Sequence, residues 1–279
     1  MRPEVQYQKA VKPDECALIT ELFARRLAHP FALLAYRLGL SPNAVTVLAG
    51  LCWVFSTPLA VVAGWLSGHG RPTAGLVVWF GCGFLWNAGY ILDLADGSLA
   101  RMTGRSSRRG FYLDYVFHLL FKPAFLLSIG IGLHQAHGGG LLWLLLAVFS
   151  IPGNWSASSS AVEHVLCEEY GKGKLPAEEL DDSASRALWL GVTDMKEAAT
   201  QKALTKSGWI KAVVVEIFSY YGQFTFFSLT VLADILLSRS VNGAMPITSS
   251  CFILVTVVMV VRTPFRVWRD YRRIAASDL

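Results

Sequence analysis

The chain has 279 residues, of which 53% are hydrophobic and only 16% are charged. Soluble domains carry roughly 25% charged residues, so this composition excludes an ordinary water-soluble protein and indicates an integral membrane protein. The formal net charge of +5 predicts contact with anionic lipid headgroups and phosphate-bearing ligands, and no nucleic-acid partner is expected.

The N-terminal segment, residues 1–39, alternates charged and apolar side chains from residue 14 to residue 38. This spacing predicts an amphipathic helix with one apolar and one charged face, lying on the cytoplasmic surface of the membrane. Packing of the same helix against the rest of the protein is an equal alternative and does not exclude the first. Pro30 is expected to interrupt the helix. Its apolar face would consist of Leu18, Ile19, Leu22, Phe23 and Leu27.

The remainder, residues 40–279, is predicted to be one membrane domain. Ser41 followed by Pro42 is typical of a helix start, because proline is favoured in the first turn. Six stretches are apolar and about long enough for the roughly 20 residues that a bilayer crossing takes. Each should be helical, because lipid offers no hydrogen-bond partner to the backbone. The predicted fold is therefore an all-α bundle of six transmembrane helices near residues 44–66, 74–93, 111–133, 141–161, 210–237 and 247–261, the last continuing to about residue 268.

The basic residues predict an orientation for these spans. With the N-terminus in the cytoplasm, only Arg71 and Arg239 among the 25 Lys and Arg residues fall on the opposite side. Such a bias is typical of cytoplasmic segments, so both termini and the connection at residues 163–209 are expected in the cytoplasm. That connection is long for a loop without structure of its own, which indicates a functional or disordered segment.

Polar side chains gather where the second predicted span ends and the third begins. Asp93 and Asp96 are three residues apart, and Asp114 and His118 are four apart, so each pair shares one face of a helix. Ionisable groups at membrane depth are costly and usually functional. Converging carboxylates repel one another unless cations lie between them, and oxygen ligands suit Mg²⁺ or Mn²⁺. The alternative is that these aspartates only cap helices at the membrane interface.

The same run matches a known signature. It reads D-L-A-D-G-S-L-A-R from Asp93 to Arg101, followed by Gly110, Asp114 and His118. It resembles the CDP-alcohol phosphotransferase motif D-x2-D-G-x2-A-R-x8-G-x3-D-x3-D, of which this chain departs only at the last position, with His118 in place of aspartate. The run Ser-Pro-Asn at 41–43 is similar to a T-P-N-x-x-T element of that family. With the predicted orientation of the spans, the site would face the cytoplasm.

This resemblance implies a reaction and a set of roles. An acceptor hydroxyl attacks the phosphate distal to cytidine in a CDP-linked alcohol, CMP leaves, and a phosphodiester forms. A divalent metal, Mg²⁺ or Mn²⁺, is implied as cofactor, and a homodimer as the assembly. The implied metal ligands are Asp93, Asp96, Asp114 and His118, with Asp114 and His118 as the catalytic pair. The implied nucleotide-binding residues are Asp96, Gly97, Ala100, Arg101 and Gly110.

His118 leaves three roles open. A neutral imidazole is available near pH 7 and can replace the missing aspartate as a base. It can also bind a metal, although it favours Mn²⁺, Co²⁺ or Zn²⁺ over Mg²⁺ more than a carboxylate does. Finally, it can mark a protein whose turnover is impaired or redirected. Four basic residues are candidates for binding the acceptor or a phosphate, with a plain cluster of cytoplasmic charge as the alternative: Arg105, Arg108, Arg109 and Lys122.

The product class stays open. Phospholipid biosynthesis is the first hypothesis, with CDP-diacylglycerol and a polar alcohol, or a CDP-linked headgroup and diacylglycerol, as substrates. The second is the joining of a CDP-polyol to a polyol phosphate, which gives a soluble phosphodiester. Residues 12–14 and 23–27 loosely resemble family members that catalyse this reaction. The third is a nucleotide-binding or scaffold membrane protein without turnover. The expected partners are a CDP-linked donor, an alcohol or lipid acceptor and membrane lipids.

Overall fold

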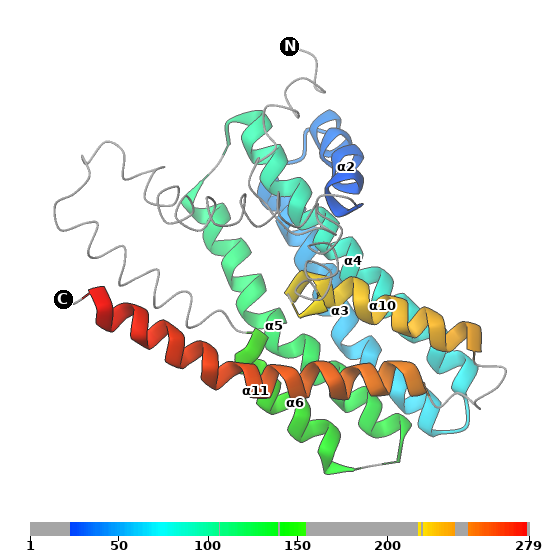
Figure 1. Ribbon diagram of the computed structural model, residues 1–279. Helices are drawn as coiled ribbons and strands as arrows, with labels where there is room; N and C mark the ends of the chain where they lie inside the picture. The colour runs from blue at the N-terminus through cyan, green and yellow to red at the C-terminus, as the bar shows by residue number, and fades with distance from the viewer. Residues whose placement is uncertain are drawn as a thin grey trace, which may run out of the picture.

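The computed structural model describes residues 23–105, 107–138, 140–154, 217–218, 220–237 and 245–277. Within these residues the secondary-structure elements are all α-helices, which confirms the all-α prediction (Figure 1). The elements in chain order are α2 (Arg25–Arg37), α3 (Pro42–Gly68), α4 (Pro72–Thr103), α5 (Arg108–Ala136), α6 (Leu141–Asn154), α10 (Tyr220–Leu237) and α11 (Pro246–Ser277).

Four of these helices are long and apolar enough to cross a membrane, and they comprise α3, α4, most of α5 and the first part of α11. The apolar parts of α6 and α10 are shorter, at Leu141–Pro152 and Gly222–Leu237. The missing ends of these two predicted spans, residues 155–161 and 210–216, lie outside the described residues, as does most of the 163–209 connection. The chain therefore has at least four candidate spans, and the count of six stays a prediction.

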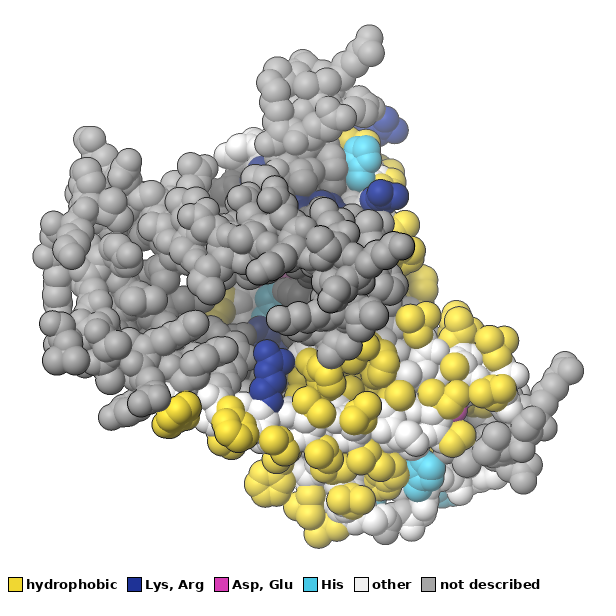
Figure 2. All heavy atoms as spheres, in the orientation of Figure 1, with side chains coloured by type: hydrophobic (Ala, Val, Ile, Leu, Met, Phe, Trp, Pro, Cys, Tyr) yellow, Lys and Arg dark blue, Asp and Glu magenta, His cyan; other side chains and the backbone are white. Residues whose placement is uncertain are grey.

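The outer faces of the helices are apolar, as a lipid environment requires. Figure 2 shows hydrophobic side chains gathered over the part of the surface formed by α10 and α11. Large apolar side chains are exposed on both helices, although they would be buried in a soluble protein of this size. They include Leu229, Leu232, Leu236, Leu254, Val257 and Val261.

Two helices extend further than the hydropathy of the sequence predicted. The second span was expected to end at Asp93, but α4 continues to Thr103. It ends only at Gly104, whose φ of 64° is left-handed and whose N–H bonds to the carbonyls of Ala100 and Arg101. Likewise, α11 is one helix through Ser277. Polar residues end a hydrophobic run but not a helix. The first part of the signature, Asp93–Arg101, therefore lies within α4, and its remaining residues lie in α5.

The N-terminal helix differs in one respect from the sequence prediction. Pro30 lies inside α2 and does not interrupt it, because a proline in the second turn removes only one backbone hydrogen bond. One face of α2 packs on α4 through Ala28, Ala32 and Ala35. The opposite side exposes Phe23, Leu27, Phe31, Leu34 and Leu38. Packing against the bundle is thus present; a position on the membrane surface stays a prediction, and residues 1–22 lie outside the described residues.

Close approach of α3 to its neighbours organises the part of the bundle that carries the site. A Cβ on Gly64 of α3 would lie 2.0 Å from the carbonyl oxygen of Gly132 in α5. On the other side, a Cβ on Gly89 of α4 would lie 2.3 Å from Nε1 of Trp53 in α3. Only glycine permits these contacts, and small residues commonly allow membrane helices to pack this closely. As a result, α3 packs against both α4 and α5.

Buried polar contacts attach α10 and α11 to this core. Asn87 of α4 donates to the Ser228 hydroxyl of α10 at 2.8 Å and accepts from Thr225 at 2.9 Å. Asp234 of α10 accepts from the first backbone N–H groups of α11, at 3.0 and 2.8 Å. Hydrogen bonds between helices stabilise a membrane bundle modestly and make its register specific. Beyond the end of α5, His137 contacts the hydroxyl of Ser249 at 2.7 Å, and burial lowers its pKa.

Candidate active site

Two local capping motifs set the start of the helices that carry the site. Ser41 caps α3 by accepting from the N–H of Ala44 at 3.2 Å, and Pro42 occupies the first helical position, as the sequence predicted. Ser107 caps α5 in the same way, accepting from the N–H of Gly110 at 3.1 Å. This second cap was not predicted, although a serine three residues before the signature glycine is a recognisable signal.

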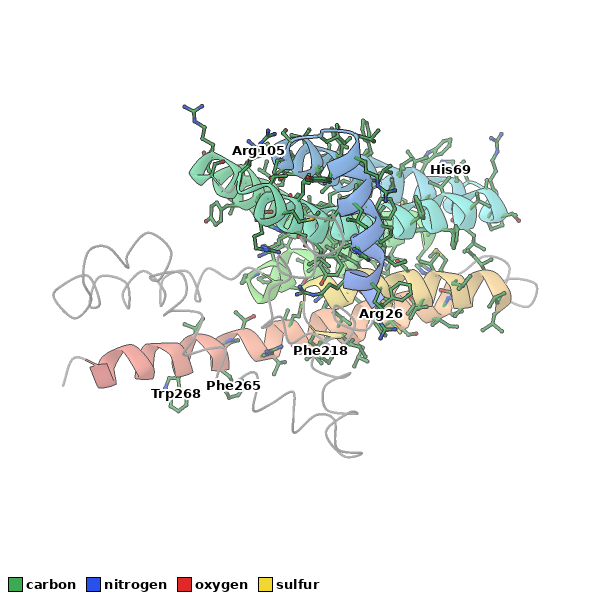
Figure 3. All side chains as sticks on the ribbon, turned by 90° about the horizontal axis from the view of Figure 1, so that it is seen from above. Arg26, His69, Arg105, Phe218, Phe265 and Trp268 are labelled. Atoms are coloured by element: carbon green, nitrogen blue, oxygen red, sulfur yellow. The ribbon has the colours of Figure 1, made fainter. Side chains whose placement is uncertain are left out.

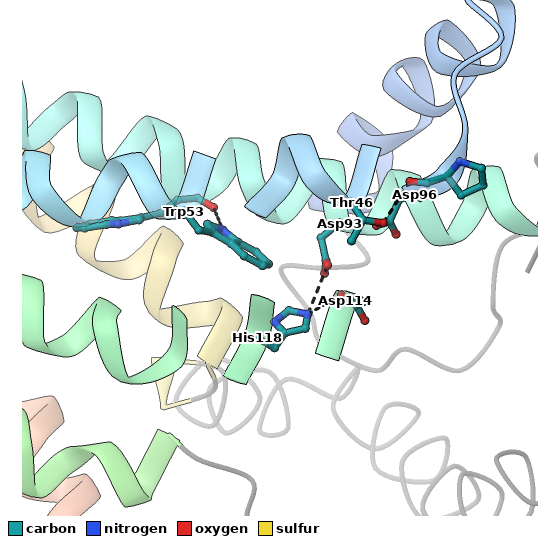
Figure 4. Close-up of polar contacts among 8 residues, drawn as sticks. Thr46, Trp53, Asp93, Asp96, Asp114 and His118 are labelled. Carbon is teal, nitrogen blue, oxygen red and sulfur yellow. Dashed lines mark hydrogen bonds and ion pairs between the residues drawn. The ribbon is translucent and has the colours of Figure 1, made fainter. Parts of the chain in front are cut away.

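The centre of the site is an imidazole between two carboxylates (Figure 4). Nε2 of His118 lies 3.1 Å from Oδ1 of Asp114, one turn earlier on α5, and 3.4 Å from Oδ1 of Asp93 on α4. The side chains of His118 and Asp93 are only 13% and 12% exposed, whereas Asp114 is 38% exposed. The group is therefore buried on the α4 side and open on the Asp114 side.

This group has the composition of a metal site. One ligand atom from each of Asp93, Asp114 and His118 lies within 4.8 Å of the others, a separation that one ion can bridge. Two carboxylate oxygens and an imidazole nitrogen are ligands for Mg²⁺, Mn²⁺ and related divalent ions. Burial of like charges is costly without a cation, so the arrangement fits a divalent metal.

Asp96 lies outside this three-residue group. It is buried, and its Oδ2 accepts a short hydrogen bond from the hydroxyl of Thr46 on α3, which also lies 3.2 Å from the carbonyl of Pro42. Thr46 was not among the predicted site residues. The signal was present, because Thr46 is the final threonine of the S-P-N-x-x-T run that resembles the family element. The contact joins that element to the signature.

The small residues of the signature create space for polar neighbours. A Cβ on Gly97 would lie 3.3 Å from a guanidinium nitrogen of Arg101, so Arg101 lies close over Gly97. Arg101 also reaches the hydroxyl of Ser98 at 3.5 Å. A Cβ on Gly110 would lie 2.8 Å from Oδ1 of Asn43, so the glycine lets α5 begin against α3. Ala100, on the same stretch of α4, is half-buried.

Of the four basic residues predicted to bind acceptor or phosphate, the structure brings Lys122 to the centre. It lies one turn beyond His118 on α5, is half-buried, and interacts electrostatically with Asp114 and Asp93. Arg105 and Arg109 are exposed, and Figure 3 shows Arg105 at one end of the molecule, pointing outward. The side chain of Arg108 lies outside the described residues.

An aromatic wall closes the inner side of the site. The ring of Trp53 lies 5.1 Å from the imidazole of His118, between ring centroids, and stacks on Phe121 at 5.2 Å. Its Nε1 donates to the carbonyl of Trp86 at 3.2 Å, which fixes the indole. No local pattern in the sequence distinguishes Trp53 from the other tryptophans. The wall is apolar where it meets the imidazole, so water is excluded from that side.

Comparison with known families agrees with this geometry. Residues 39–156, which include α3 to α6, match the family model of CDP-alcohol phosphatidyltransferases. This part of the chain is therefore similar to a CDP-alcohol phosphatidyltransferase domain. The family transfers a phosphate-linked group from a CDP-linked alcohol to an alcohol acceptor, generally in membrane phospholipid synthesis, and typically needs a divalent metal. The resemblance read from the signature is thereby confirmed. No curated protein and no solved structure matches the chain.

Proposed function

We propose that this CDP-alcohol phosphatidyltransferase domain is an active enzyme of phospholipid biosynthesis, and that His118 replaces the aspartate that ends the family motif. The observation that carries the proposal is the position of His118, whose Nε2 lies beside the carboxylates of Asp93 and Asp114. A histidine that had merely lost a function would not need two carboxylates, one of them largely buried, within contact distance of one ring nitrogen. Asp93 and Asp114, beside His118, are the residues that would hold Mg²⁺ or Mn²⁺. Asp96 of the same motif is the further proposed ligand.

The proposed reaction is a displacement at phosphorus. The oxygen of the acceptor hydroxyl forms a bond to the phosphate distal to cytidine, and the bond from that phosphorus to the CMP oxygen breaks. A divalent ion held by Asp93 and Asp114 would supply positive charge to the pyrophosphate and to the leaving oxygen. CMP leaves with the electron pair of the broken bond, and the product is a phosphodiester.

His118 takes the proton that the acceptor hydroxyl loses. The imidazolium that results lies against Asp93 Oδ1 and Asp114 Oδ1, and their negative charge stabilises it, as a carboxylate stabilises the histidine of other acid–base pairs. Trp53 excludes water from the inner side of the ring, so the proton comes from the acceptor and not from solvent on that side.

The signature stretch of α4 is the proposed nucleotide site. Gly97 and Ala100 leave room for a flat ring or a sugar to approach the helix, and Arg101 beside Gly97 supplies a guanidinium for a phosphate. Gly110 keeps the start of α5 close to α3, next to this space. Asp96, held by Thr46, provides a fixed carboxylate at the same level.

The orientation in the membrane follows from charge. Arg101, Arg105 and Arg109 lie around the turn between α4 and α5, at the end of the bundle nearest the site, whereas Arg71 is the basic residue at the other end of α4. By the positive-inside rule, we place the site and both termini toward the cytoplasm. The proposed assembly is a homodimer in the membrane.

The test is CMP release by the purified protein with Mg²⁺ or Mn²⁺, over a panel of CDP-linked donors and lipid or polyol acceptors. We expect release that needs metal and one acceptor, that is lost in Asp93→Asn and that falls strongly in His118→Asn. Extraction of the product into organic solvent distinguishes a phospholipid from a soluble phosphodiester. Binding of CDP without release of CMP, with activity appearing only in His118→Asp, would contradict the proposal and favour a nucleotide-binding protein without turnover.

A further inference from the structure

We infer that this active site holds one divalent cation per chain, and that Lys122 supplies the positive charge that a second ion would otherwise bring. The inference deepens the proposed function, because the ion would serve the same transfer reaction. Ion occupancy is nevertheless a property of the free protein, so it can be measured without substrate and without turnover.

The formal charge of the site favours a single ion. Histidine at position 118 removes the fourth carboxylate of the motif, which leaves Asp93, Asp96 and Asp114 as the acidic groups. With the ammonium of Lys122, the formal charge of the site is −2, which a single divalent ion neutralises. Two divalent ions would leave a net charge of +2 in a site that lies within candidate membrane spans. Uncompensated charge at such a position is expensive, so the balance favours one ion.

The separation of the candidate ligand atoms also favours a single ion. The carboxylate oxygens of Asp93 and Asp114, with Nε2 of His118 beside them, lie within 4.8 Å of one another, a separation that fits the coordination sphere of one ion. Sites with two metals keep the ions about 3.5–4 Å apart, and both ions need ligands around them. Asp96 is the only further carboxylate of the motif, and one of its oxygens already accepts a hydrogen bond from Thr46. The described residues therefore supply one compact ligand set.

Lys122 lies where its positive charge can act on the acidic group. Residues 114, 118 and 122 follow one another at intervals of four, so Asp114, His118 and Lys122 lie on one face of α5 in successive turns. Lys122 is half-buried and interacts electrostatically with both Asp93 and Asp114. An ammonium beside Asp93 and Asp114 repels a second cation and attracts a phosphate oxygen of the donor or acceptor. Lys122 is thus a positioning residue for the phosphate, next to the ion site.

The test is to count Mn²⁺ ions bound to metal-stripped protein in detergent, using the electron paramagnetic resonance signal of free Mn²⁺. We expect one ion per chain in the native protein. The double variant His118→Asp/Lys122→Met restores the fourth carboxylate and removes the ammonium, and we expect it to bind two. The matched control His118→Asn/Lys122→Met changes the same positions without adding a carboxylate, and we expect it to bind one.

Two ions in the native protein would overturn the inference, and this result does not depend on whether any variant folds. One ion in a folded His118→Asp/Lys122→Met variant would overturn it as well, with folding checked by size-exclusion elution and circular dichroism. CMP release measured on the same native sample separates this inference from the proposed function. One bound ion without release of CMP contradicts only the proposed function, whereas release of CMP with two bound ions contradicts only the inference.

Discussion

Gly89 offers a direct test of how tightly the aromatic wall is packed behind the site. It lies on α4 one turn before Asp93, and a Cβ at this position would lie 2.3 Å from Nε1 and 2.6 Å from Cδ1 of Trp53. Trp53 is only 1% exposed and stacks on Phe121, so its ring has little room to move. Gly89→Ala must therefore displace either the indole or α4 itself.

The expected magnitude follows from a matched control on the same helix. Gly81 is also in α4, and a Cβ there meets no atom within 4 Å. Both Gly→Ala changes bring the same gain of about 1 kcal/mol in helix propensity, so the difference between them isolates the steric cost. Overpacking costs about 1–3 kcal/mol, and loss of the Trp53 hydrogen bond to Trp86 adds about 1 kcal/mol.

The assay is thermal unfolding of the two variants in the same detergent, followed by tryptophan fluorescence. Because 1 kcal/mol corresponds to roughly 2–4 °C in Tm for a domain of roughly 150–250 residues, Gly89→Ala should melt several degrees below Gly81→Ala. CMP release should also fall more in Gly89→Ala, since Trp53 contacts His118. If Gly89→Ala melts at or above the temperature of Gly81→Ala, the indole is not wedged between α3 and α4, and the account of the wall is wrong.

Three further predictions concern polar contacts. Thr46→Val should lower CMP release by at least about tenfold, because it removes the side-chain hydrogen bond to the buried Asp96, whereas Thr57→Val, which loses only a bond to a helix carbonyl, should not; equal effects would refute the role of Thr46. Asp234→Ala should lower stability by about 0.5–2 kcal/mol through loss of the α11 cap, seen as a lower Tm with CMP release per folded molecule unchanged. Burial lowers the pKa of His137, so the unfolded state takes up its proton first as the pH falls below about 6.5. The Tm should therefore fall from pH 7 to pH 5, and His137→Gln should flatten that slope; an unchanged slope would contradict the assignment.

Much of this architecture follows from local features of the chain. Long apolar stretches must be helical in lipid, so the all-α class and the approximate positions of α3, α4 and α5 were predictable. The start of α3 was predictable from Ser41 and Pro42, because capping depends on neighbours in sequence. The spacing of the signature likewise identified the family before any coordinates, since fixed intervals between specific residues are visible in one dimension.

Helix ends were harder to predict than helix cores. Hydropathy placed the end of the second span at Asp93, although α4 continues to Thr103 and is ended by Gly104. The reason is that hydropathy reports where apolar residues stop, whereas a helix continues until a residue such as a left-handed glycine ends it. Pro30 was misjudged for a related reason, because an interior proline removes one backbone hydrogen bond without having to end the helix. Pro58, Pro123 and Pro264 lie inside α3, α5 and α11 in the same way.

The arrangement of the site is a tertiary property. Thr46 and Asp96 are 50 residues apart, and they meet only because α3 packs on α4. His118 reaches Asp93 because α3 also packs on α5, which places the third helix beside the second. The sequence determined which residue types the site contains and how they are spaced along each helix. The packing of α3, through glycines that admit Trp53 and a neighbouring backbone, decided which of those residues face one another, because contacts between helices depend on shape and not on sequence interval.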